Sequence, residues 1–139
     1  MAKPTEILAG VPLFGGLSKR QLRRVFDLAE EAIYMEGHAV VREGQPGDSF
    51  FVLLAGQARV VGKSGRLIAR LLPGDFFGEI SLLDGGARIA SVVSETPLTT
   101  LMIKRRPFVK LLESEPEIAM QMLKEVARRL RRAERRISG

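Results

Sequence analysis

The chain contains no cysteine and a single histidine, His38. Without cysteine it can form neither a disulfide framework nor a cysteine-based zinc site, and the absence agrees with the cytoplasmic location that we expect. One histidine is too few for a metalloenzyme that gathers several histidines and carboxylates on one metal. No Gly-x-Ser-x-Gly nucleophile motif is present either. We therefore predict no enzyme activity, no catalytic residue, no metal site and no cofactor.

Long apolar runs are also lacking. The longest, Phe50 to Ala55, has six residues, far fewer than the ~20 that a membrane-spanning helix needs. No charged and then apolar segment of the signal-peptide kind opens the chain, so we expect no membrane partner. The glycine motifs of dinucleotide-binding folds and P-loops are missing too, which excludes those two phosphate-binding folds.

Composition bounds the size and the charge. With 139 residues and 45% hydrophobic content, the chain has the length of one domain with a real core. The formal net charge is +6, of which +5 falls between Lys124 and Gly139. The basicity therefore belongs to one terminal helix, and a nucleic-acid surface over the whole domain is not expected.

The order of elements predicts a mainly β fold with helices at its ends. Residues 5–10 favour a short helical turn, and residues 11–16 form a turn-rich link. Ser18 and Gln21 then make a capping box that starts a helix. From residue 32 onward, short β-favouring runs alternate with glycine turns, which predicts a β sandwich, roll or barrel. The expected strands are Ala32–Met35, Ala39–Arg42, Ser49–Leu54, Ala58–Val61, Leu67–Leu71, Ile89–Val93 and Leu98–Ile103.

Two helices are predicted to close the chain. Pro107 suits the first turn of one, and a second capping box, Ser114 with Glu117, predicts the start of the other. Apolar residues of this last helix repeat at heptad spacing, at Ala119, Leu123, Val126, Leu130, Ala133 and Ile137. We expect Ala119 and Leu123 to pack on the domain itself. Beyond Val126, pairing with a second copy of the chain remains an equal alternative.

The chemistry is concentrated in residues 76–93. Gly78 lacks a Cβ and lets the backbone approach a ligand closely. Arg88 lies among small and apolar residues, where an unpaired cation is costly unless it meets an anion, and its guanidinium suits two phosphate oxygens. Glu79 would accept hydrogen bonds from hydroxyls of the same ligand. A nucleotide combines both features; the alternative is that Arg88 forms an ion pair with Asp84 or Glu79.

Residues 77–83 followed by 88–92 closely resemble the phosphate-binding cassette of the cyclic nucleotide-binding domain family. That family includes bacterial catabolite activators, kinase regulatory subunits and cyclic-nucleotide-gated channels. The resemblance continues through residues 42–53, Gly56 and residues 72–76, and spans roughly residues 13–130 in the family's order. It implies an α+β, mainly β fold: an antiparallel, jelly-roll-like β-roll with an N-terminal helix and two C-terminal helices.

The resemblance also implies the site. We expect the ligand to be bound by Phe77, Gly78, Glu79, Ile80, Ser81, Arg88, Ile89 and Ala90. Glu79 would take the ribose 2′-hydroxyl and Arg88 the cyclic phosphate. Many members have Ser or Thr where this chain has Ile89; the missing hydroxyl favours cAMP over cGMP, which stays a candidate.

Contacts to the base are less defined by the sequence. The catabolite activators reach the adenine with a Thr and a Ser on the last helix, where this chain has Ala133 and Glu134. The same helix acts as a lid over the base in family members. Arginines are the candidates for stacking on a purine here, at Arg131, Arg132 or Arg135.

We divide the chain into an N-terminal helical turn and link at 1–17, a cyclic nucleotide-binding domain at 18–130 and the basic end of the last helix at 131–139. The expected partners are a cyclic nucleotide, an effector protein of undetermined identity and, through the last helix, a second copy of the chain. Specific DNA binding is not expected, because catabolite activators bind DNA with a helix-turn-helix after this helix. The alternative is a degenerate domain that serves as an interaction or dimerisation module or binds another anion.

Overall fold

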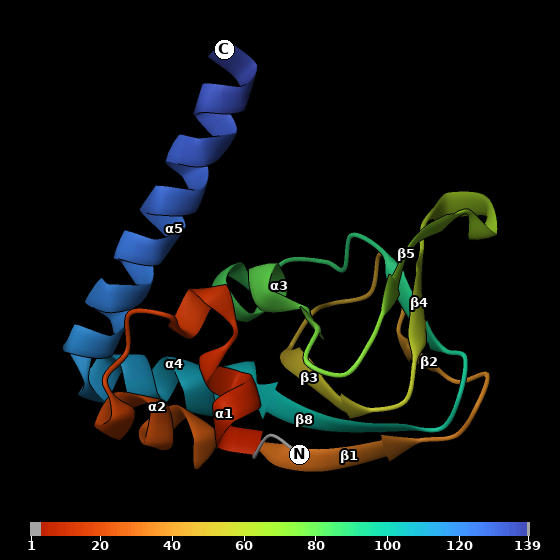
Figure 1. The fold of residues 1–139 in the computed structure, drawn as a ribbon, viewed down its shortest axis with the longest axis horizontal. Helices are drawn as coiled ribbons and strands as arrows, with labels where there is room; N and C mark the ends of the chain where they lie inside the picture. The colour runs from red at the N-terminus through yellow and green to blue at the C-terminus, as the bar shows by residue number, and fades with distance from the viewer. Residues whose placement is uncertain (1–3, 139) are drawn as a thin grey trace.

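The computed structural model describes residues 4–138, and side chains up to residue 135 (Figure 1). The strands are β1 (Glu30–Tyr34), β2 (Ala39–Val41), β3 (Ser49–Ala55), β4 (Ala58–Val61), β5 (Leu67–Leu71), β6 (Phe76–Phe77), β7 (Ser91–Ser94) and β8 (Leu98–Lys104). The helices are α1 (Pro4–Ala9), η1 (Pro12–Phe14), α2 (Lys19–Phe26), η2 (Lys63–Gly65), α3 (Glu79–Asp84), α4 (Arg105–Ser114) and α5 (Pro116–Ser138). No helix among the described residues has the length and apolarity to cross a membrane.

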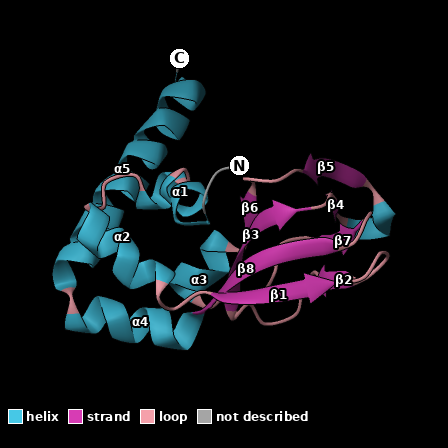
Figure 2. Cartoon of the chain, turned by 60° about the horizontal axis from the view of Figure 1, so that its bottom comes forward, coloured by secondary structure: helices cyan, strands magenta, loops and turns pink. Residues whose placement is uncertain are grey.

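The strands form two four-stranded antiparallel sheets, in the orders β1-β8-β3-β6 and β2-β7-β4-β5. Helices α1, α2, α4 and α5 gather at one end of this roll, and α5 extends away from the body (Figures 1 and 2). The predicted α+β fold, an antiparallel β-roll with an N-terminal helix and two C-terminal helices, is therefore confirmed.

Local signals explain how several elements begin. The capping box predicted for α2 is present: the Ser18 hydroxyl accepts from the Gln21 amide at 3.1 Å, and the Gln21 side chain accepts from the Ser18 amide at 2.9 Å. The second predicted box is wrong. Ser114 is the last residue of α4, where its hydroxyl donates to the Leu111 carbonyl, and α5 begins at Pro116 instead.

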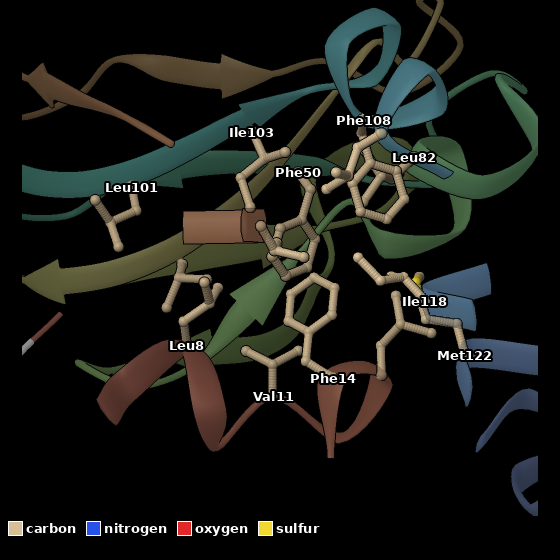
Figure 3. Close-up of a cluster of buried hydrophobic side chains, with 14 residues drawn as sticks. Leu8, Val11, Phe14, Phe50, Leu82, Leu101, Ile103, Phe108, Ile118 and Met122 are labelled. Atoms are coloured by element: carbon tan, nitrogen blue, oxygen red, sulfur yellow. The ribbon is translucent and has the colours of Figure 1, made fainter. Parts of the chain in front are cut away.

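Two apolar clusters hold the molecule together. The larger joins the roll to the helices and includes Leu8 and Phe14 from the N-terminal segment and Ile118 and Met122 from α5 (Figure 3). The smaller lies between the sheets, around Phe51. The first packs the two ends of the chain against the roll, and the second fixes the strands beneath the predicted ligand site.

Helix α5 differs from the predicted seam. Val126 packs against the larger cluster, whereas Leu123, which we expected to pack on the domain, is 61% exposed. The exposed apolar positions Met120, Leu123, Ala127 and Leu130 form a line that we call the outer stripe. Its spacing of three and four residues is that of a heptad seam, rotated slightly from the predicted one. The side chain of Ile137 lies outside the described residues.

Candidate functional site

A pocket of about 230 Å³ lies where α3, the loop after it and the second sheet meet. Its lining contains all eight residues predicted to bind the ligand, from Phe77 to Ser81 and from Arg88 to Ala90. Side chains from the strands complete the wall: Val41, Val60, Phe76 and Val92. The structure thus brings together two segments that the sequence separates by six residues.

The close approach at Gly78 requires a glycine. Its φ is +87°, a left-handed conformation that residues with a Cβ rarely adopt. A Cβ built there would lie 2.6 Å from Nη1 of Arg88 and 2.7 Å from the Ser49 carbonyl oxygen. Gly78 therefore lets the arginine lie directly against the backbone at the start of α3.

Arg88 is a buried cation that forms no ion pair within the described part of the chain. Its side chain is 7% exposed, and Nη1 is buried without a hydrogen-bond partner. The guanidinium lies 6.0 Å from the centre of the Phe51 ring. Burial lowers the pKa of Arg88, and the charge of Asp48 opposes this only in part.

The backbone of Arg88 is held in place by the loop of residues 42–48. Its amide donates to the Gln45 carbonyl at 2.9 Å, and its own carbonyl accepts from Gly44 at 2.9 Å. These bonds keep residues 88–90 out of the second sheet, so that β7 begins at Ser91 and not, as predicted, at Ile89. The arginine is therefore fixed at the pocket by its main chain, while its side-chain donors remain available.

Neither of the acids predicted as alternative partners of Arg88 pairs with it among the described residues. The Asp84 carboxylate accepts from the Gly86 amide at 2.7 Å. The Glu79 carboxylate is bound by Arg129 of α5, at 2.7 Å and 3.0 Å to its two oxygens. The hypothesis of an Arg88 ion pair with Asp84 or Glu79 is thus wrong, and the question of what neutralises this buried cation remains.

The pair of Glu79 with Arg129 is the feature that sequence reasoning missed. The Glu79 side chain is 16% exposed, and its hydrogen bonds raise the pKa of Arg129. Met122, Val126 and Arg129 are spaced four and three residues apart, so they share the face of α5 that packs on the body. That periodicity was the available signal. The predicted lid residues are all exposed and none lines the pocket: Arg131, Arg132 and Arg135.

The arrangement offers a cation, a carboxylate and apolar walls in one small pocket. A phosphate fits the unpaired guanidinium, because charge-assisted bonds to Arg are strong and frequently bidentate. A hydroxyl fits Glu79, and a flat apolar group fits the valines and isoleucines of the wall. Among the described residues, no three carboxylate or imidazole side chains gather as metal ligands.

Comparison with known proteins agrees with this chemistry. Residues 31–115 match the model of the cyclic nucleotide-binding domain. The chain is 31% identical, over 91% of its length, to a CRP-like cAMP-activated global transcriptional regulator of Mycobacterium tuberculosis, of which it covers 58%. It is 34% identical, over 77% of its length, to the cGMP-dependent protein kinase egl-4 of Caenorhabditis briggsae, of which it covers 15%.

A solved structure shows the same fold. The N-terminal domain of a transcriptional regulator from Streptomyces coelicolor superposes with a TM-score of 0.85 at 30% identity, covering 94% of both chains. The chain spans less than two thirds of the two curated relatives named above, so their activities as whole proteins are not transferred to it. The shared fold, the matched family model and the identity to the relatives lead to one conclusion: the chain belongs to the cyclic nucleotide-binding domain family.

Proposed function

We propose that this chain is a regulatory sensor domain that binds cAMP in preference to cGMP, with the cyclic phosphate held by residues 76–93. The observation that carries the proposal is Arg88, whose buried Nη1 has no partner within the described protein. A buried charge without a partner costs free energy, and a phosphate would satisfy it. The relatives' names support a cyclic nucleotide without deciding which one, since they include a cAMP-activated regulator and a cGMP-dependent kinase.

The preference for cAMP rests on Ile89. This residue lines the pocket, is 77% exposed and has no hydroxyl to offer to a phosphate or to the amino group of guanine. A site that cannot satisfy a polar group of the ligand binds that ligand more weakly. We therefore expect the additional polar groups of guanine to find no partner at this position.

Glu79 is proposed to bind the ribose 2′-hydroxyl while it remains paired with Arg129. Each carboxylate oxygen has two acceptor sites, so the bonds from Arg129 leave room for a hydroxyl. Arg129 does not line the pocket, and its role would be to orient the carboxylate. Stacking of Arg131, Arg132 or Arg135 on the base stays a prediction, because it requires α5 to move over the pocket.

The output of such a sensor would be regulatory and not catalytic, passed to an effector protein or to a second copy of the chain. The outer stripe of α5 is the surface that we propose for dimerisation. The cytoplasmic location, the absence of specific DNA binding and the domain boundaries at 17 and 130 remain predictions from the sequence.

The decisive experiment is calorimetric titration with cAMP and cGMP, using protein unfolded and refolded to remove carried-over ligand. We expect saturable binding that is tighter for cAMP. Arg88→Ala should weaken binding by about 2–4 kcal/mol, which is more than tenfold. If Arg88→Ala bound cAMP as tightly as the wild type does, Arg88 would not be a ligand-binding residue. No binding of either nucleotide to the wild type would favour the degenerate interaction module.

A further inference from the structure

Glu115 is the single residue between α4 and α5, and its backbone serves both helices. Its amide donates to the Leu111 carbonyl at 2.8 Å, which ends α4, and its carbonyl accepts from Ile118 at 3.0 Å, which begins α5. Its dihedral angles, φ −130° and ψ 77°, belong to neither helix. The conformation of this residue, together with the packing of Ile118 and Met122 in the larger cluster, therefore contributes to the angle at which α5 leaves the body.

The Glu115 side chain is held by two arginines of α2. Oε1 accepts from Nη1 of Arg20 at 2.9 Å, and Oε2 forms an ion pair with Arg24, 3.2 Å from its Nε but without hydrogen-bond geometry. The glutamate side chain is 17% exposed, whereas those of Arg20 and Arg24 are 70% and 48% exposed. The two arginines lie one turn apart on the same face of α2. Both contact Glu115, the joint between α4 and α5.

A small rotation at this joint has a large effect at Arg129. The 14 residues between Glu115 and Arg129 span about 21 Å of helix, so a tilt of about 10° would displace the arginine by about 4 Å. Its hydrogen bonds to Glu79 are 2.7 Å and 3.0 Å long and cannot survive such a shift. The position of Arg129 is thus sensitive to the geometry of a residue far from the pocket.

We propose that Glu115, clamped by Arg20 and Arg24, is a positioning residue for the nucleotide site. The clamp holds α5 at the angle where Arg129 reaches and orients Glu79, and so couples α2 to the pocket. Its effect on nucleotide affinity rests on the proposed function; its effect on the angle of α5 does not.

The angle of α5 can be measured without nucleotide. Because the chain has no cysteine, spin labels on Arg59→Cys in β4 and Ala133→Cys in α5 report one intramolecular distance when labelled protein is diluted with unlabelled protein. We expect Glu115→Gln, and the double variant Arg20→Gln/Arg24→Gln, to shift or broaden this distance. Both arginines are exposed, so losing their partner should not unfold the protein.

Asp27→Asn is the matched control, since Asp27 forms an exposed ion pair with Arg23 of α2, at 3.1 Å, that does not involve Glu115. It should leave the distance unchanged. An identical distance distribution in the wild type, Glu115→Gln and the double variant would show that the ion pairs of Glu115 do not hold α5 at its angle.

The coupling is then tested with cAMP. Glu115→Gln should weaken binding by about three- to tenfold and Asp27→Asn should not. In an Arg129→Ala background, Glu115→Gln should have no further effect, because the clamp acts through Arg129. A full effect in that background would contradict the coupling. If the wild type bound no nucleotide, the proposed function would fail. The distance measurement would still show whether the ion pairs of Glu115 hold α5 at its angle.

Discussion

Arg88 is a buried cation, and its burial costs the domain free energy. Its guanidinium is buried with one nitrogen unpaired, and burial lowers its pKa. Methionine has a similar length and no charge, so Arg88→Met should stabilise the ligand-free domain by about 1–2 kcal/mol while it abolishes nucleotide binding. Urea unfolding without ligand measures this change. Arg59→Met, on the exposed side of β4, is the control and should change stability little; a destabilised Arg88→Met would show that the charge is compensated.

Alanine variants of Gly78 and Gly74 distinguish the cost of backbone strain from the cost of steric crowding. Both have positive φ, +87° and +95°, but a Cβ at Gly74 would meet nothing within 4 Å, whereas one at Gly78 would meet Arg88 and Ser49. Gly74→Ala should therefore cost only the conformational term of about 1–2 kcal/mol. Gly78→Ala should cost more and should also weaken cAMP binding, because Arg88 must move. Equal losses of stability in the two variants, with binding intact, would contradict the close approach.

At the scale of elements, the pair of Arg129 with Glu79 joins α5 to α3. Arg129→Ala should free the outer part of α5, raising its amide exchange, and should weaken cAMP binding by about tenfold because Glu79 loses its orienting donors. Arg128→Ala is the control, since Arg128 pairs with Glu125 within the same helix. Tighter cAMP binding to Arg129→Ala would mean that Arg129 competes with the ribose for the carboxylate.

At the scale of the whole molecule, the outer stripe of α5 is an apolar surface without a partner in the described chain. Met120, Leu123 and Leu130 are 54%, 61% and 59% exposed. Fewer than three heptads make a weak coiled coil, so we expect a dimer that is concentration-dependent and strengthened by nucleotide. Sedimentation velocity should show that Leu123→Glu removes it and that Lys124→Glu does not. A wild type that stays monomeric with saturating nucleotide would contradict the stripe as an interface.

The sequence predicted those parts of the molecule that depend on local pattern. The α2 cap and most strands follow from residue type and period. Strand β6 was missed because its two residues, Phe76 and Phe77, have no period of their own and pair only through β3. The eight predicted ligand-binding residues line one pocket because they belong to two short segments, around Gly78 and Arg88, that the resemblance to the family had already connected.

The rest depends on how elements are placed against each other. Four neighbouring arginines on α5 have the same chemistry, and only the rotation of the helix about its axis, set by Met122 and Val126, selects Arg129 to face Glu79. Ser114 failed as a cap because α4 extends through it. Tertiary packing determines which face of a helix is buried and where the helix ends. In a single sequence the buried face is indicated only by a weak helical period of apolar residues.

The two apolar clusters imply an order of assembly. The smaller one is built from residues between Tyr34 and Met102, so this part of the roll can pack as soon as that middle segment is available. The larger one needs both Leu8 and Met122, so it can close only after α5 has been made. The pocket, which is lined by residues between Val41 and Val92, can therefore form before α5 packs against the body, and the roll exposes its helix-facing side until α5 has been made.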